Sequence, residues 1–183
     1  MFKKNEAVKI LVAVIAPIIV VAVVFFLIIT FANIQTTIDT KETQTFASVN
    51  DKEIVSIFFN SAHENDLSQE LLKVEVVTTS ESITQGLSGR STIGADGMLF
   101  IFQNKAQQYF WMKDMLFNLD IIWIADTTVV GITKAVQKPE ENTPDNRLKI
   151  YPSEVEVDMV LELPAGDVYK YGITQGQTIQ LAH

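Results

Sequence analysis

Cysteine is absent from the 183-residue chain, which excludes disulfides, cysteine-ligated zinc, iron–sulfur clusters and thiol catalysis. The chain has only eight glycines and five prolines, which excludes a collagen-like chain. Its hydrophobic content of 48% excludes a disordered chain. The two histidines, His63 and His183, have no metal-ligand neighbour at a useful spacing. The sequence therefore predicts neither a metal site nor a cofactor.

Basic residues are scarce relative to acids. Fourteen Lys and Arg residues stand against 22 Asp and Glu residues, which gives a formal net charge of -8. Domains that bind nucleic acid are usually basic, because they neutralise phosphates. The charge therefore indicates that nucleic acid is not a partner.

One long apolar run dominates the N-terminal part of the sequence. No charged residue occurs between Lys9 and Asp39, and residues 10–32 are almost wholly apolar. About 20 such residues suffice for a helix to cross the hydrocarbon core. A cleaved signal peptide has a shorter apolar region, of roughly 7–15 residues, followed by small residues. The run is therefore interpreted as an uncleaved membrane anchor.

The flanking charges predict the orientation of this anchor. Lys3, Lys4 and Lys9 precede it, and loops rich in Lys and Arg stay on the cytoplasmic side. The chain is accordingly expected to be a single-pass protein of the cell membrane with its C-terminal domain outside the cytoplasm. The expected organisation is a cytoplasmic N-terminus (1–9), a transmembrane segment (10–32), a polar stalk (33–50) and an extracytoplasmic domain (51–183).

The C-terminal domain reads as a series of short strands. The segment after residue 51 is ambiguous, because Asn50 and Glu53 have capping-box spacing while IVSIFF is β-branched and aromatic; a strand is favoured. Strand-like runs follow at 73–79, 98–102, 108–112, 116–125, 127–136, 155–163 and 177–181. Short helices are expected at 80–87 and 164–171. The predicted fold is mainly β, a sandwich or barrel with two short helices, behind one transmembrane helix.

The run 155–163 alternates with a period of two residues. One face carries only apolar side chains: Val155, Val157, Met159, Leu161 and Leu163. The other face carries Glu156, Asp158, Val160 and Glu162. This pattern is typical of a strand with one buried and one solvated face, so Glu162 is expected to be solvated.

Several ordered motifs resemble those of one family. They are Gly86-Leu-Ser-Gly-Arg90, Gly97-Met-Leu-Phe-Ile-Phe102, Phe110-Trp-Met-Lys-Asp-Met-Leu116, Leu119-Asp-Ile-Ile122 and Val160-Leu-Glu-Leu163. Over residues 72–183 the chain resembles the family of domain of unknown function 192 (DUF192). That resemblance implies an exported, β-rich domain without an established activity.

Asp120 is the most informative polar residue, because it interrupts an otherwise apolar strand. By alternation it shares a face with Leu116, Ile122 and Ile124. A carboxylate on such a face must be paired or hydrogen-bonded. Either it pairs with Lys113 or Arg90, or it accepts hydrogen bonds from loop amides; a functional group with a perturbed pKa is the further alternative.

An aromatic and cationic face is also expected. Tyr109, Trp111 and Lys113 share one side of a strand if alternation holds, and aromatic shelves beside a cation are common in sugar and peptide sites. Phe110 and Met112, on the other side, are expected in the core. The first hypothesis is a non-enzymatic binding module with a shallow cleft for an envelope glycan, peptide or protein, lined by Arg90, Trp111, Lys113, Asp114 and Asp120.

Two alternatives remain open at this stage. A glycosidase-like hydrolase would use Asp120 and Glu162 as its acid and base, about 5–10 Å apart in one cleft. An assembly factor would instead recognise a membrane-protein partner through an exposed apolar patch. Without a cysteine or a suitably placed histidine, nucleophilic catalysis has few available groups, so the sequence favours binding over catalysis.

Overall fold

The computed structural model describes Phe26, residues 45–60 and residues 70–182. The chain divides into two units, Met1–Thr43 and Gln44–His183. The predicted anchor apart from Phe26, most of the predicted stalk, His63 and His183 lie outside the described residues. Within the described part of the chain, no helix is both long and apolar enough to cross a membrane.

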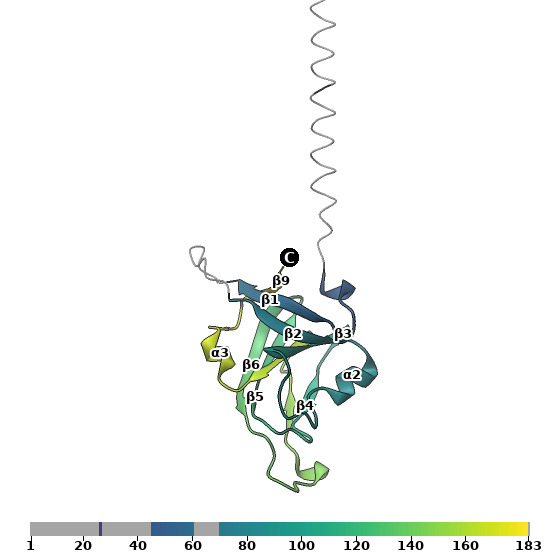
Figure 1. The fold of residues 1–183 in the computed structure, drawn as a ribbon, viewed down its shortest axis with the longest axis vertical. Helices are drawn as coiled ribbons and strands as arrows, with labels where there is room; N and C mark the ends of the chain where they lie inside the picture. The colour runs from purple at the N-terminus through teal and green to yellow at the C-terminus, as the bar shows by residue number, and fades with distance from the viewer. Residues whose placement is uncertain (1–25, 27–44, 61–69, 183) are drawn as a thin grey trace, which may run out of the picture. The chain divides into compact units, whose positions relative to one another are not determined.

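Seven strands of the second unit form a closed barrel (Figure 1). The strands are β1 (Ile54–Asn60), β2 (Leu72–Val77), β3 (Gly97–Ala106), β5 (Leu119–Ala125), β6 (Thr128–Val136), β8 (Val157–Pro164) and β9 (Thr178–Leu181). Their order around the barrel is β1-β2-β3-β8-β5-β6-β9. Neighbours are antiparallel except β2 and β3, which are parallel. The mainly β prediction is confirmed, in the form of a barrel.

Two short helices and a two-stranded ribbon lie outside the barrel. Figure 1 shows α2 (Ser80–Gln85) and α3 (Asp167–Lys170) on opposite sides of it. The predicted run at 108–112 does not join the barrel; it forms β4 (Tyr109–Trp111), which pairs with β7 (Ile150–Pro152). Short 3-10 turns occur at Phe46–Ser48 and Asp145–Arg147.

Local sequence explains where these elements begin and end. The strand favoured after residue 51 is confirmed as β1. The hydroxyl of Thr79 accepts a hydrogen bond from the Ser82 amide in a capping box that starts α2. Asp126 and Thr127 adopt positive φ angles in the tight turn between β5 and β6, as the twist of a hairpin requires. Gly172 follows α3 with a φ of 60°, as expected for a residue that ends a helix.

The folded unit begins earlier than predicted. Val49 is buried in the main hydrophobic cluster and Phe46 packs against the same cluster. Both residues fall within the predicted stalk (33–50). Isolated apolar residues in a Thr-rich segment are typical of a linker, but Phe46 and Val49 pack against the barrel core. The boundary therefore lies near residue 44 rather than residue 51.

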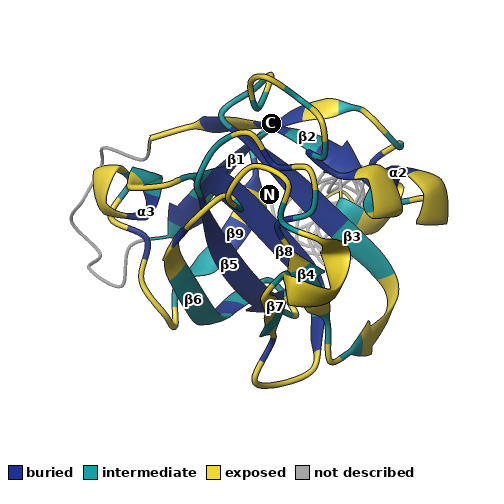
Figure 2. Ribbon diagram, turned by 90° about the horizontal axis from the view of Figure 1, so that it is seen from below, coloured by how far each residue is buried: buried dark blue, intermediate teal, exposed yellow. Residues whose placement is uncertain are grey.

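Two hydrophobic cores share the central strands. The first cluster fills the barrel and includes Val74, Leu99, Ile122, Leu161 and Ile179. The second, here called the outer core, lies on the opposite face of β3, β8 and β5, and its members include Met98, Phe100, Ile121, Trp123 and Val160. Side chains from α2, from the β4–β7 ribbon and from the intervening loops cover it. Figure 2 shows β5 and β8 as largely buried, whereas β3 is buried only along its first part.

Gly97 shows how tightly the central strands pack. It is the first residue of β3. A Cβ atom there would lie 2.5 Å from Leu163 Cδ2 and 2.7 Å from the Glu162 carbonyl oxygen. Only glycine permits this approach.

Candidate functional site

A cavity of about 280 Å³ opens between the outer face of the barrel and the elements that cover it. Its walls come from α2, from the loop after α2, and from β3, β4 and β8. The lining residues are Ile83, Thr84, Gln85, Gly86, Leu87, Ser88, Phe100, Phe102, Gln108, Tyr109, Phe110, Trp111, Met115 and Glu162. The lining is therefore mixed: apolar and aromatic side chains stand beside hydroxyl and amide groups and one carboxyl group.

Aromatic packing fixes one wall of this cavity. Phe100 and Phe110 meet edge to face, with ring centroids 5.0 Å apart and an interplanar angle of 85°. Phe110 makes a second edge-to-face contact with Trp123, at 5.7 Å. Such pairs favour defined ring positions, so this wall is formed before any ligand arrives.

Glu162 is the only carboxyl group among the lining residues. In the sheet its side chain lies between Met98 on β3 and Ile121 on β5, because directly opposite residues share a face. The residue is 5% exposed. Burial raises the pKa of its carboxyl group to about 8, because the charged form loses its hydration. Among residues 45–60 and 70–182, no group donates a hydrogen bond to this carboxyl.

The prediction that Glu162 is solvated is therefore wrong. The period-two pattern assigned the residues of β8 to the correct faces, but the outward face around Val160 and Glu162 is covered by the outer core. Val155, expected on the buried face, is exposed and precedes the strand. Val160 could have indicated this burial from the sequence, because an apolar residue on a face predicted to be solvated suggests that other elements cover that face.

Asp120 lies on the opposite face of the same sheet. Its side chain is 1% exposed and accepts three backbone hydrogen bonds. Oδ1 accepts from the Ala135 amide at 2.7 Å, and Oδ2 accepts from the amides of Gly166 and Val168 at 2.9 and 3.2 Å. The predicted role as an acceptor for loop amides is confirmed, whereas the proposed pairing with Lys113 or Arg90 is wrong. Asp120 connects an irregular point of β6, where Ala135 has a φ of 52°, to the start of α3.

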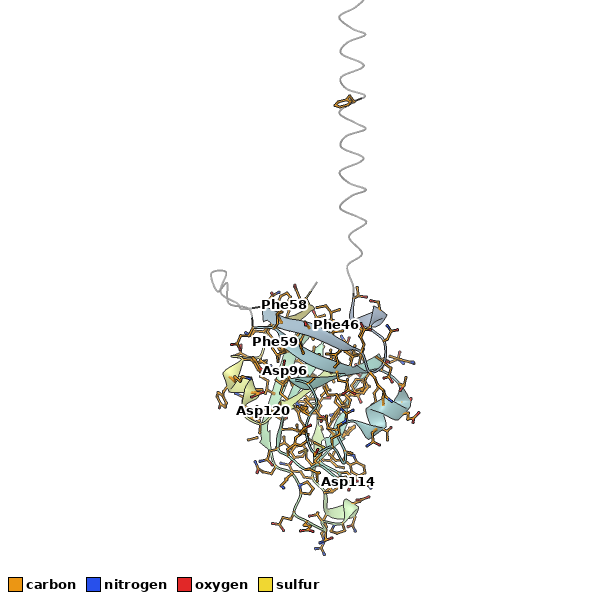
Figure 3. All side chains as sticks on the ribbon, in the orientation of Figure 1. Phe46, Phe58, Phe59, Asp96, Asp114 and Asp120 are labelled. Carbon is orange, nitrogen blue, oxygen red and sulfur yellow. The ribbon has the colours of Figure 1, made fainter. Side chains whose placement is uncertain are left out.

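The five predicted cleft residues do not line one site. Trp111 lines the cavity, but Arg90 lines a neighbouring depression, where its guanidinium pairs with Glu75 at 2.6 Å. Lys113 forms an ion pair with Asp145 and lies 5.5 Å from the centroid of the Trp111 ring. Figure 3 shows Asp114 and Asp120 well apart, with Asp114 toward the ribbon end of the barrel and Asp120 near α3.

The aromatic face was predicted more accurately. Tyr109 and Trp111 are 63% and 49% exposed, while Phe110 packs against the outer core and Met112 is buried in it. The exposed pair forms the rim of the cavity. Sequence reasoning missed the contributions of Phe100, Phe102 and Gln108, because they become neighbours of Trp111 only through tertiary packing.

The geometry does not support the paired carboxylates of the hydrolase alternative. Glu162 is opposite Ile121, and Asp120 is opposite Leu163, so the two acids point to different faces of β5 and β8. The sheet itself separates them. Asp120 accepts its hydrogen bonds from backbone amides. Glu162, in contrast, lines the cavity.

Fold and site together define a class: a small closed β-barrel whose outer face is covered by a ribbon and a helix that enclose a cavity. The chain belongs to the DUF192 family, whose description is "Uncharacterized ACR" and whose model matches residues 62–181. The expected resemblance is thereby confirmed. No curated protein matches the chain significantly.

Two solved structures share this fold. One is a protein from Sinorhizobium meliloti 1021, described as a candidate transcription regulator, with 27% identity and a TM-score of 0.61. The alignment covers 73% of this chain and 98% of that chain. The other is a protein of unknown function from Novosphingobium aromaticivorans DSM 12444, with 23% identity, a TM-score of 0.59, and coverage of 77% of this chain and 94% of the other.

Proposed function

We propose that the chain is a non-enzymatic binding module that takes its ligand into the cavity between α2 and β4. The observation that carries this proposal is the cavity itself, with a fixed aromatic wall and one carboxyl group to which none of the described residues donates a hydrogen bond. Binding sites combine apolar walls with a few placed polar groups in this way. The site differs from the shallow cleft expected from sequence, since only Trp111 is common to both.

The size of the cavity limits what it can enclose. Sites for drug-sized ligands occupy roughly 300–1,000 Å³. A cavity of about 280 Å³ therefore suits a single ring or one side-chain-sized group. We propose that it holds one such group of an envelope glycan or peptide, while Tyr109 and Trp111 at the rim contact the rest.

The location is part of the proposal. The apolar run at 10–32 is proposed to anchor the chain in the cell membrane, with the barrel on the extracytoplasmic side. A net charge of -8 opposes nucleic-acid binding. The role described for the S. meliloti protein is for that reason not proposed here. A membrane-protein partner that inserts one side chain into the cavity is compatible with the same site.

A thermal-shift screen of the full-length chain in detergent micelles tests the proposal, using envelope sugars, peptidoglycan fragments and short peptides. A ligand at 100 times its Kd stabilises the folded state by about 2.7 kcal/mol. In Ser88→Trp, an indole at the cavity wall should fill the space and abolish the shift. Ser91→Trp is the matched control, because Ser91 is exposed and does not line the cavity. An equal shift in both variants would place the ligand elsewhere.

A further inference from the structure

Glu162 differs from the other buried polar side chains in the described part of the chain. Those side chains are Ser82, Asp120, Ser153 and Glu162. Ser82 bonds to Asp51 at 2.6 Å, Ser153 bonds to the Val155 carbonyl at 2.7 Å, and Asp120 accepts three amide bonds. Glu162 has no such partner, and no fully enclosed polar atom among the described side chains lacks one. Its carboxyl oxygens must therefore reach the space of the cavity.

We propose that the cavity selects a cation, an alkylated ammonium group whose charge is neutralised by the Glu162 carboxylate and whose methyl groups pack on the aromatic wall. This inference rests on the proposed function, since it specifies the chemistry of the same site. A buried polar group without a partner requires an explanation, and a ligand that supplies the missing charge provides one.

The charges around the cavity favour a cation over an anion. None of the lining residues is Lys or Arg. The two basic residues expected in the cleft both have acidic partners: Lys113 pairs with Asp145, and Arg90 makes two hydrogen bonds to Glu75 at 2.6 and 2.9 Å. An anionic ligand would meet a carboxyl group and no compensating charge. A cationic ligand would meet the only carboxyl group of the lining.

The walls favour an alkylated ammonium over a primary amine. A primary ammonium has three N–H donors, each of which needs an acceptor once it leaves water. Five aromatic side chains line the cavity: Phe100, Phe102, Tyr109, Phe110 and Trp111. Aromatic faces attract cations electrostatically, and methylated ammonium groups are bound in proteins by such walls. A quaternary ammonium has no N–H group left unsatisfied there.

Proton release provides an independent signature. Burial holds the pKa of Glu162 near 8, so most of the carboxyl is protonated at neutral pH in the empty cavity. A bound cation favours the carboxylate, so binding should release a proton. The other titratable group of the lining is Tyr109 on β4; α2 and β3 contribute no charged side chain to it, and Lys113 faces the ring of Trp111.

The test compares choline with its neutral carbon analogue, 3,3-dimethylbutan-1-ol, by calorimetric titration of the full-length chain in detergent micelles at millimolar ligand. Choline should bind at least about tenfold more tightly, a difference of about 1.4 kcal/mol. Glu162→Gln should remove this preference, lowering choline affinity while leaving the neutral analogue unchanged. Glu156→Gln removes the same charge from an exposed residue and serves as the control. Titrations in buffers of different ionisation enthalpy should show proton release at neutral pH.

Equal binding of the two probes, or an unchanged choline affinity in Glu162→Gln, would overturn the cation proposal and leave the binding module standing. Binding of choline without proton release, with the same affinity in Ser88→Trp, would place the cation outside the cavity and overturn it too. Absence of choline binding also overturns it. The binding module itself fails only if the wider thermal-shift panel and the Ser88→Trp comparison both find no ligand in the cavity.

Discussion

Asp120 and Glu162 are two buried acids on the same pair of strands, and they are opposites. Asp120 faces one side of the sheet and accepts three backbone hydrogen bonds, whereas Glu162 faces the other side and accepts none from the described residues. Both are almost inaccessible to solvent. Burial alone therefore does not distinguish these two acids. The presence or absence of hydrogen bonds from the described residues does.

The comparison also separates the two cores. Asp120 lies where β5, β6 and α3 meet, and its bonds tie those elements together. Glu162 lies under a cover formed by α2 and the β4–β7 ribbon. The barrel side is thus a closed arrangement with its polar groups satisfied. The covered side retains open space beside an acid to which none of the described residues donates a hydrogen bond, and these properties are typical of a binding site.

The largest expected change in unfolding free energy comes from removing the carboxylate of Asp120. Asp120→Ala leaves the amides of Ala135, Gly166 and Val168 without their acceptor. An unsatisfied buried group costs roughly 1–3 kcal/mol, so unfolding free energy should fall by at least about 3 kcal/mol. Urea titration of the full-length chain in micelles, followed by tryptophan fluorescence, measures it. Asp114→Asn is the control at an exposed acid, and a loss of similar size there would contradict the assignment.

Sequence reasoning identified Asp120 because a lone acid in an apolar strand must be compensated. It predicted most barrel strands, since β5, β6, β8 and β9 carry clear β-type patterns. Sequence reasoning could not predict how the β4–β7 ribbon covers the outer core. β7 follows a polar loop at 138–147 and pairs with β4 some 40 residues earlier along the sequence, a contact between Trp111 and Ile150 that no local pattern encodes. The burial of Glu162 follows from that long-range pairing.

The pH dependence of unfolding free energy should differ between the wild-type chain and Glu162→Gln. The folded-state pKa is raised to about 8 from an ordinary value of 4.5. The protonated form thus contributes stability that is fully present below pH 4.5 and is lost as the pH rises through about 8. At about 1.4 kcal/mol for each pKa unit, the wild-type chain should lose about 3 kcal/mol between about pH 5.5 and about pH 8.5. The Gln variant should show no such loss and should be the more stable protein at the higher pH.

The described acids with lowered pKa values do not contribute to a loss of unfolding free energy above pH 5. Hydrogen bonds hold the pKa of Asp51 and of Glu75 below their usual values, through Ser82 and Arg90 respectively. Their contribution has the opposite sign: it is present above the ordinary carboxyl pKa and is lost only as the pH falls below it. The difference between the wild-type chain and Glu162→Gln above pH 5 therefore reports on Glu162. Identical urea profiles for the two proteins would mean that Glu162 is hydrated in the folded state.

The smallest effect is expected at Lys113, the residue that sequence reasoning placed in the cleft. Its ammonium pairs with Asp145 at the surface, where ion pairs contribute little and are screened by salt. It contacts the Trp111 ring but does not line the cavity. Lys113→Gln should therefore leave both the urea midpoint and choline affinity unchanged within error, whereas Trp111→Ala should weaken choline binding, because it removes part of the aromatic wall. A marked loss of choline affinity in Lys113→Gln would instead place the choline contacts at the rim of the cavity and contradict their assignment to Glu162.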